Sequence, residues 1–125
     1  MQKEQITSKN APAAIGPYSQ AVRVGDLIYT SGQLPINVDT GEMETDVRAA
    51  TVASLKNIES ILKEAGSDLS KVVKTTVFIK NMDDFGIINE AYAEFFEGIA
   101  PARSCVEVAR LPKDAVLEIE AVAHI

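Results

Sequence analysis

Apolar residues alternate with polar ones in several short stretches near the start of the chain, which predicts β-strands. Residues 20–24 and 27–31 are β-favouring runs on either side of Gly25-Asp26, as expected for a hairpin. Glycine at the first loop position predicts a type II′ turn, because that position needs a positive φ. Residues 1–10 are mostly polar and are compatible with a short edge strand ahead of the hairpin.

Between residues 46 and 65, the apolar residues are spaced by three or four positions, which predicts an amphipathic helix. Thr45 or Asp46 can cap its start, and Gly66 can supply the left-handed residue that ends it. The buried face is expected to contain Val47, Thr51, Leu55, Ile58, Leu62 and Ala65.

A strand over residues 71–80 and a second helix follow. Asp83 or Asp84 can cap this helix, which is expected to run through Phe96. Its apolar face is expected to contain Phe85, Ile88, Tyr92 and Phe95 or Phe96.

The strand over residues 71–80 has apolar groups on both faces. Strict alternation places Val73, Val77 and Ile79 on one face and Val72 and Phe78 on the other. Two helices can cover only one face of a five- or six-stranded sheet, so the other face is expected to meet a copy of the chain. We therefore predict an oligomer.

Residues 101–121 form two predicted strands joined by a turn at Pro112, and they contain charge where apolar residues are the default. Alternation places Arg103, Cys105 and Glu107 on one face of the first strand. Glu118 and Glu120 likewise share a face of the second. Which of these faces meet in one cavity is left open by the pattern.

Composition narrows the class of protein. The chain has 125 residues, 46% of them hydrophobic and 24% charged, which suits one globular domain spanning residues 1–125. A formal net charge of −6 disfavours binding to nucleic acid or anionic membranes. A single cysteine forms no internal disulfide, and no basic and apolar leader is present, so a cytoplasmic location is expected.

Arg103 is the strongest candidate for ligand binding, because a guanidinium offers a charged donor fork that matches a carboxylate. The alternative is a structural ion pair with Glu107, Glu118 or Glu120. For the last two glutamates, a solvated strand face is the simpler interpretation. A glutamate lining an apolar pocket would instead serve as a general base.

Other site chemistries have little support. Cys105 and His124 resemble a nucleophile and its base only by residue type, and lone cysteines are usually small buried hydrophobes. One histidine and one cysteine far apart give no metal-ligand spacing, so no metal is expected. The glycines match neither a phosphate loop nor a dinucleotide fingerprint, and no GxSxG motif occurs.

Several motifs are distributed along nearly the whole chain: residues 11–21 (APAAIGPYSQA), 30–33 (TSGQ), 73–78 (VKTTVF), 101–108 (PARSCVEV), 111–114 (LPKD) and 118–121 (EIEA). In these motifs the sequence closely resembles the YjgF/RidA family of reactive intermediate deaminases. Their order and spacing make the resemblance specific, whereas each motif alone is weak.

The resemblance implies an α+β, chorismate-mutase-like fold with a mixed sheet carrying two helices on one face. It also implies a homotrimer with clefts between subunits. The implied activity is hydrolysis of 2-imino acids such as 2-iminobutanoate and 2-iminopropanoate, or their enamine tautomers, to 2-oxo acids and ammonia. Pyridoxal-phosphate-dependent dehydratases release such imines, and their hydrolysis needs no cofactor.

The same resemblance suggests roles for individual residues. Arg103 would hold the substrate carboxylate, and Glu118, rather than Glu120, would activate water. Backbone groups around Gly32 and Cys105 would contact the substrate, whereas Tyr18, Ser31 and Asn89 would line the pocket. The segment between Phe96 and Pro101 is shorter than in some similar proteins, which leaves substrate size open.

Two alternative functions remain. Some proteins that share the resemblance are described as ribonucleases or translation inhibitors, but the acidic charge and the lack of a basic, aromatic stripe disfavour RNA binding. A small oxo-acid sensor or chaperone-like trimer would keep the cleft without turnover. The presence of both Arg103 and Glu118 favours catalysis, because a carboxylate sensor needs only the arginine.

Overall fold

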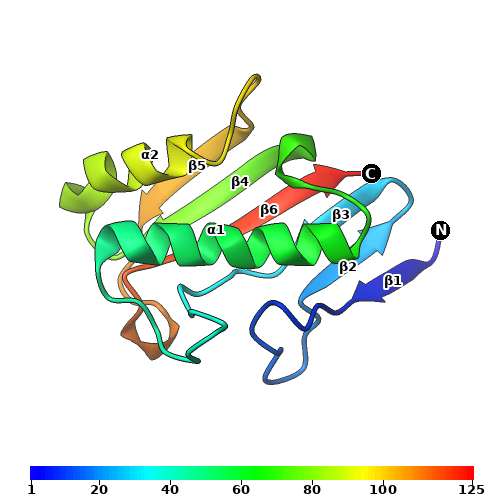
Figure 1. Ribbon diagram of the computed structural model, residues 1–125, viewed down its shortest axis with the longest axis horizontal. Helices are drawn as coiled ribbons and strands as arrows, with labels where there is room; N and C mark the ends of the chain where they lie inside the picture. The colour runs from blue at the N-terminus through cyan, green and yellow to red at the C-terminus, as the bar shows by residue number, and fades with distance from the viewer.

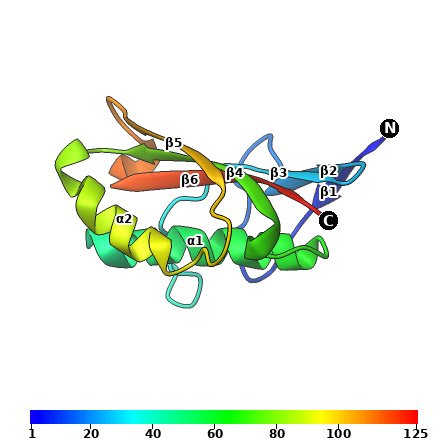
Figure 2. The ribbon, with the colours of Figure 1, turned by 90° about the horizontal axis from the view of Figure 1, so that it is seen from above.

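One mixed β-sheet and two helices on one of its faces make up the computed structural model, which describes residues 1–125 (Figures 1 and 2). The strands are β1 (Lys3–Ile6), β2 (Ala21–Val24), β3 (Leu27–Thr30), β4 (Val72–Ile79), β5 (Ala102–Glu107) and β6 (Leu117–His124). Their order across the six-stranded sheet is β1-β2-β3-β6-β4-β5. Only β4 and β5 are parallel, and the other neighbours are antiparallel. This confirms the predicted α+β class.

The predicted hairpin and edge strand are both present. β2 and β3 pair from Ala21↔Thr30 to Val24↔Leu27. Gly25 has a φ of 58°, whereas Asp26 does not have a positive φ, which is the pattern of a type II′ turn. β1 pairs with β2 at the edge of the sheet.

Helix α1 (Val47–Glu64) also forms as predicted. The Asp46 side chain caps its first turn by accepting a hydrogen bond from the amide of Ala49 at 3.0 Å. The chain leaves the helix through Gly66, which has a φ of 83° that favours glycine. The buried side of the helix includes Thr51, Leu55, Ile58 and Leu62, and it packs against the sheet.

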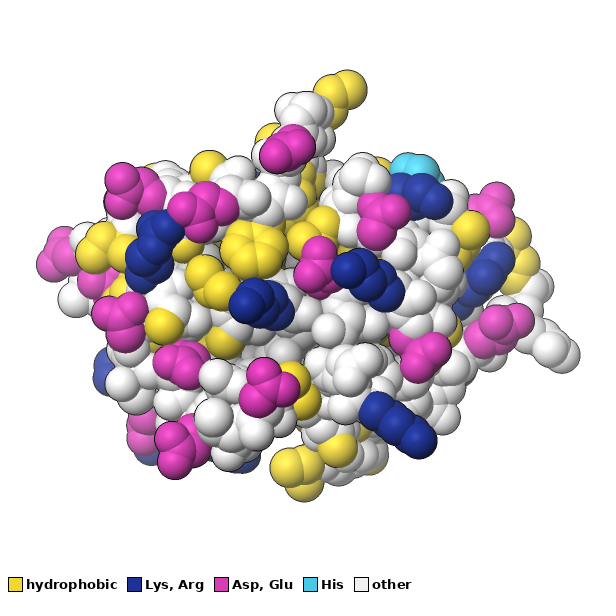
Figure 3. Space-filling view, in the orientation of Figure 1, with side chains coloured by type: hydrophobic (Ala, Val, Ile, Leu, Met, Phe, Trp, Pro, Cys, Tyr) yellow, Lys and Arg dark blue, Asp and Glu magenta, His cyan; other side chains and the backbone are white.

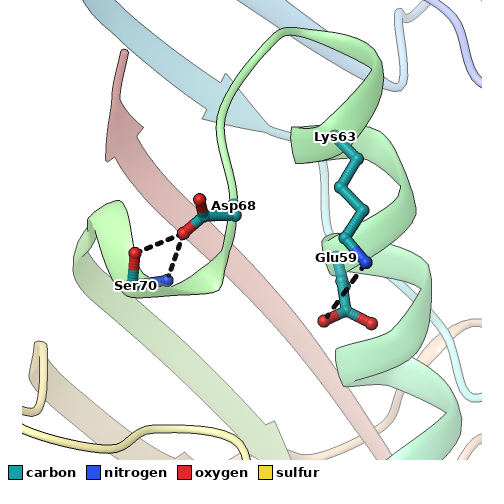
Figure 4. Close-up of polar contacts among 4 residues, drawn as sticks. All are labelled: Glu59, Lys63, Asp68 and Ser70. Carbon is teal, nitrogen blue, oxygen red and sulfur yellow. Dashed lines mark hydrogen bonds and ion pairs between the residues drawn. The ribbon is translucent and has the colours of Figure 1, made fainter.

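A short 3₁₀ turn (Leu69–Lys71) connects α1 to β4, and Asp68 caps it (Figure 4). The Asp68 carboxylate accepts hydrogen bonds from the hydroxyl and the amide of Ser70, and these bonds lower the pKa of Asp68. Lys63 and Glu59, one turn apart on α1, form an exposed ion pair nearby. The cap sets the direction in which the chain enters β4.

The predicted alternation along β4 is wrong at its start. The pairing with β6 shifts between Val72 and Lys74, which makes Val73 a β-bulge. Val72 is therefore 5% exposed, whereas Val73 is 47% exposed and does not share the buried face of Val77 and Ile79.

Helix α2 (Phe85–Ala93) is shorter than predicted. Asp84, one of the two predicted caps, is at the N-cap position, but its side chain makes no capping hydrogen bond. Asn81 caps the preceding 3₁₀ turn Met82–Asp84 by accepting from the amide of Asp83 at 2.9 Å. Phe95 and Phe96 lie beyond the helix end, but they still pack against the core.

Both helices lie on the same side of the sheet, so no element of this chain covers the other face (Figure 2). Alternation along the paired strands places Leu27, Tyr29, Phe78, Val106 and Val122 on this open face. Leu27, Tyr29 and Val106 are each more than a third exposed. An exposed apolar sheet face is typical of an interaction surface, and the predicted oligomer remains a prediction.

The helix-bearing face is charged and mixed in sign. Figure 3 shows carboxylates scattered over this face with single lysines and arginines between them, rather than a continuous basic stripe. None of the helices combines the length and apolarity needed to cross a membrane.

Candidate active site

The predicted site residues form two groups on opposite faces of the sheet. Arg103 and Cys105 on β5 face the helices, together with Asn89 on α2; we call these three residues the Arg103 group. Glu118 points toward the open face, because its neighbours Leu117 and Ile119 are buried under the helices. The two residues expected to act on one substrate are therefore separated within one chain.

Arg103 has a defined orientation but no carboxylate partner. Its Nη1 donates a hydrogen bond to Oδ1 of Asn89 at 2.7 Å. Its Cζ lies 5.4 Å from the ring centroid of Phe85 and 4.9 Å from that of Tyr92. The ion pairs of the chain are Arg48–Glu94, Lys63–Glu59 and Arg110–Asp114, and none includes Arg103. The guanidinium thus keeps an unneutralised charge and free donors.

Glu107 binds the turn before α2 and does not form the ion pair with Arg103 that the sequence suggested as an alternative. Its Oε1 accepts a hydrogen bond from the amide of Met82 at 2.8 Å, which connects the end of β5 to the turn before α2. Neither Glu107, Glu118 nor Glu120 forms an ion pair with Arg103. The structural ion-pair interpretation of Arg103 is therefore not supported in this chain.

Cys105 is half-buried and packs against the core. Burial raises the pKa of its thiol, and the nearby charge of Arg103 only partly opposes this effect. Cys105 and Ile119 are both register partners of Val77, and His124 lies five residues farther along β6, which corresponds to about 16 Å. Cys105 and His124 therefore do not form a dyad.

The second group surrounds a cleft of about 760 Å³, which we call the Glu118 cleft. It contains four predicted site residues: Tyr18, Ser31, Gly32 and Glu118. Its walls come from the loop before β2, the segment after β3 and the turn before β6. The exposed apolar side chains of Ile15 and Val38 also line it.

The Glu118 carboxylate lies in this cleft without a hydrogen bond or ion pair from the rest of the chain. Its pKa is raised, first by burial and second by the like charge of Glu120. A carboxylate with a raised pKa and free lone pairs is suited to accept a proton from water.

Gly32 allows the Glu118 side chain to lie directly against the backbone. A Cβ atom at position 32 would be 2.6 Å from Cδ and 2.7 Å from Oε1 of Glu118, closer than such atoms approach. Glycine thus leaves the space that the carboxylate occupies, and a Cβ at this position would displace the Glu118 side chain. The backbone conformation does not require glycine, because Gly32 does not have a positive φ.

Tyr18 and Ser31 are held by hydrogen bonds to the cleft walls. The Ser31 hydroxyl donates to the carbonyl of Ser19 at 2.6 Å, and its amide donates to the carbonyl of Gln20. The Tyr18 hydroxyl accepts from the amide of Ile15 at 3.3 Å. The two Ser31 bonds connect the loop before β2 to the end of β3, whereas the Tyr18 bond lies within that loop.

Gln20 is not among the predicted site residues, but it is 3% exposed and anchors the same loop. Its Oε1 accepts from the amide of Ser8 at 2.6 Å, and its Nε2 donates to the carbonyls of Ser8 and Pro12 at 3.1 and 2.7 Å. The sequence feature that could have indicated this role is the polar amide side chain of Gln20 directly before an apolar strand. A buried side chain of this type needs hydrogen-bond partners, and here the loop backbone supplies them.

Lys113 is a second residue at the site that is not among the predicted site residues. It lines the Glu118 cleft, and it and Asp114 have φ values of 56° and 55°, which is uncommon for residues other than glycine. Asp114 forms an ion pair with Arg110 at 2.8 Å, which supports this turn. No set of three or more His, Cys, Asp or Glu side chains is arranged to hold a metal ion.

Comparison with known proteins accounts for almost the whole chain. The sequence model of a protein family described as Endoribonuclease L-PSP, the YjgF/RidA family, matches residues 8–125. The chain belongs to this family. It is 53% identical to the 2-iminobutanoate/2-iminopropanoate deaminase of Escherichia coli K12 over 121 residues, which is 94% of each chain.

Solved structures of YjgF/RidA-family proteins have the same fold. The Rid-family protein YyfA from Yersinia pestis superimposes with a TM-score of 0.96 at 50% identity, covering 99% of this chain and 100% of the other. E. coli TdcF with bound serine gives a TM-score of 0.94 at 46% identity, covering 98% of each chain. Both the Arg103 group and the Glu118 cleft thus lie within a fold that the family shares.

Proposed function

We propose that this YjgF/RidA-family protein is an enzyme that hydrolyses 2-imino acids, such as 2-iminobutanoate and 2-iminopropanoate, to 2-oxo acids and ammonia. The observation that carries the proposal is the presence of two specialised side chains in one chain. Arg103 is an oriented cation without a carboxylate partner, and Glu118 is a partly desolvated carboxylate. The E. coli deaminase that is 53% identical supports this substrate class.

The two groups can act on one substrate only if the active site lies between subunits. Arg103 is on the helix side of β5, at the edge of the sheet, and Glu118 is on the open face of β6. A chorismate-mutase-like homotrimer, in which open sheet faces pack together, brings Arg103 of one copy to the Glu118 cleft of the next. Burial of the apolar open face would stabilise this assembly.

In the proposed reaction, the Arg103 guanidinium binds the substrate carboxylate through two parallel hydrogen bonds. The Glu118 carboxylate takes a proton from water while the water oxygen bonds to the imine carbon. Glu118 returns this proton to the nitrogen, which gives a carbinolamine. Glu118 then takes the proton of the new hydroxyl group and passes it to the nitrogen as the carbon–nitrogen bond breaks, so that ammonia leaves and the carbonyl of the 2-oxo acid forms. The imine is already electrophilic, so orientation and one proton shuttle suffice.

The remaining predicted residues have supporting roles in this proposal. Gly32 and Cys105 contribute backbone groups to substrate and intermediate, while Tyr18, Ser31 and Asn89 border the site. The cysteine thiol is not a nucleophile, in agreement with its raised pKa. The reaction uses no cofactor.

A coupled assay tests the activity directly. A threonine dehydratase releases 2-iminobutanoate in the presence of a trapping amine, and the protein is expected to divert the imine from the trap to 2-oxobutanoate. Arg103→Ala is expected to abolish this effect while sedimentation still shows a trimer. If the wild-type protein binds 2-oxobutanoate but does not accelerate its formation, the protein is an oxo-acid-binding module and the deaminase proposal fails.

Mixing two inactive variants tests the position of the site. Arg103→Ala and Glu118→Gln, unfolded together in equal amounts and refolded, would recover about one quarter of the wild-type sites if each site combines residues of two subunits in a closed ring. Recovery of no activity, with normal trimer formation, would place the site within one chain.

A further inference from the structure

Helix α2 presents three side chains to the Arg103 guanidinium. Phe85, Asn89 and Tyr92 are spaced by four and three residues, so they lie on one face of the helix. Asn89 accepts a hydrogen bond from Nη1 of Arg103, and the two aromatic rings lie 5.4 and 4.9 Å from Cζ. Both distances are within the range of a cation–π interaction.

The Tyr92 ring is itself fixed to the sheet. Its hydroxyl lies 2.7 Å from Oγ1 of Thr75 on β4, and the two residues are 6% and 1% exposed. Thr75 is the register partner of Arg103 in the parallel pair of β4 and β5. The Tyr92 ring also packs against Phe96 at a centroid distance of 4.7 Å. The hydrogen bond therefore connects the ring under the guanidinium to the strand beside Arg103.

Core packing alone does not require this polar pair. A phenylalanine at position 92 and a valine at position 75 would occupy nearly the same volume and bury no hydroxyl groups. Burial raises the pKa of Tyr92, so the phenol stays protonated and keeps its hydrogen bond. The pair instead restricts the Tyr92 ring, and through it the plane of a guanidinium that has only one hydrogen bond of its own.

We propose that Tyr92, anchored by Thr75, is a positioning residue that fixes the plane of the Arg103 guanidinium for recognition of the substrate carboxylate. This inference rests on the proposed carboxylate-binding role of Arg103 and extends it to a buried pair that does not touch substrate. Asn89 fixes one edge of the guanidinium, and Tyr92 fixes its face. The remaining donors are then presented in one orientation.

Two variants remove the hydrogen bond while keeping the shape of the core: Tyr92→Phe and Thr75→Val. Each is expected to weaken binding of 2-oxobutanoate, measured by calorimetry, and to raise KM for the imine about fivefold with little change in kcat. The double variant is expected to be no worse than either single variant, because both remove one interaction. Thr75→Ser keeps a hydroxyl and is expected to restore wild-type affinity.

Ser67→Ala is the matched control, because it removes a buried hydroxyl that donates to the carbonyl of His124 at 2.7 Å, at the far end of β6. It is expected to lower thermal stability without changing affinity for 2-oxobutanoate. Equal affinity losses in Ser67→Ala and Tyr92→Phe would mean that the Tyr92–Thr75 pair is only structural, and would overturn the proposal.

A second measurement separates this proposal from the proposed function. Nuclear magnetic resonance relaxation of the Arg103 Nε–H group reports its order without any ligand. Order is expected to fall in Tyr92→Phe and Thr75→Val, and to stay unchanged in Ser67→Ala. If wild-type protein binds no 2-oxobutanoate, the carboxylate role fails, whereas unchanged order of Arg103 in both variants overturns the positioning role.

Discussion

Replacing Gly32 with alanine tests whether the position of the Glu118 carboxylate controls turnover. The new Cβ would lie 2.6 Å from Cδ of Glu118, whereas ordinary contacts begin at 3.4 Å. The carboxylate must therefore retreat by about 0.8 Å, the difference between these distances. The backbone at Gly32 needs no left-handed φ, so alanine introduces no strain of its own.

The magnitude follows from the role of a general base. A catalytic group displaced by about 1 Å loses about 100-fold in rate, and general-base catalysis contributes about 100- to 10,000-fold in total. We expect kcat of Gly32→Ala to fall about 100-fold. Stability should change by no more than about 1 kcal/mol, because the Glu118 side chain can swing away and the alanine reduces the entropy of the unfolded chain.

The dehydratase-coupled assay, thermal melting and sedimentation measure these quantities on the same samples. Gly86→Ala is the matched control: a Cβ at position 86 meets no atom within 4 Å, and this glycine lies on α2 without a positive φ. It should keep wild-type turnover. Retention of more than half of the wild-type kcat by Gly32→Ala would refute the reasoning, as would a further loss when Gly32→Ala is added to Glu118→Gln.

Four other predictions concern the same site. The raised pKa of Glu118 means that the folded state favours the protonated acid. The ionised carboxylate therefore lowers the stability of the fold at neutral pH, and this loss of stability disappears as the pH falls through the folded-state pKa. Glu118→Gln should therefore melt at a higher temperature than wild type at pH 7, with the difference fading in acid, and an unchanged melting temperature at pH 7 contradicts this. Glu120→Gln removes the like charge and should move the acid limb of the kcat/KM profile to lower pH; no movement would show that burial alone sets the pKa. Cys105→Ala should retain most turnover in the coupled assay, and a loss as large as that of Arg103→Ala would make the thiol catalytic. Gln20→Leu leaves loop amides and carbonyls unpaired, so urea unfolding should show a loss of about 2 kcal/mol, together with a lower kcat/KM.

Elements with strong local signals were predictable from the sequence. Helix α1 combines a regular apolar period with Asp46 at its start and Gly66 after its end, and all three signals agree with the structure. The turn at Gly25 was predictable for the same reason, because its signal is the glycine itself. The bulge at Val73 was not predictable, because it arises from how β4 pairs with β6 and leaves no mark on the alternation of residue types.

The separation of Arg103 from Glu118 is a second feature that could not be predicted from the sequence. Alternation predicted correctly which residues share a face of β5 and which share a face of β6. It did not relate the two strands, because β4 lies between them and runs parallel to one and antiparallel to the other. The hydrogen bond from Arg103 to Asn89 also depends on how α2 packs across β5, which is a tertiary property.

The place of β6 in the sheet has a consequence for how the chain folds. β6 follows every other strand in sequence, yet it lies between β3 and β4 and is the only strand that joins β1–β3 to β4 and β5. During synthesis, the hairpin and the β4–α2–β5 unit can form early, but they cannot be joined until β6 has left the ribosome. Contacts between β3 and β6 span most of the chain, so this step is expected to be slow, and it leaves two open strand edges exposed to other chains while it is pending. Glu118 is on β6, so the candidate catalytic carboxylate would enter the site in the same step that closes the sheet.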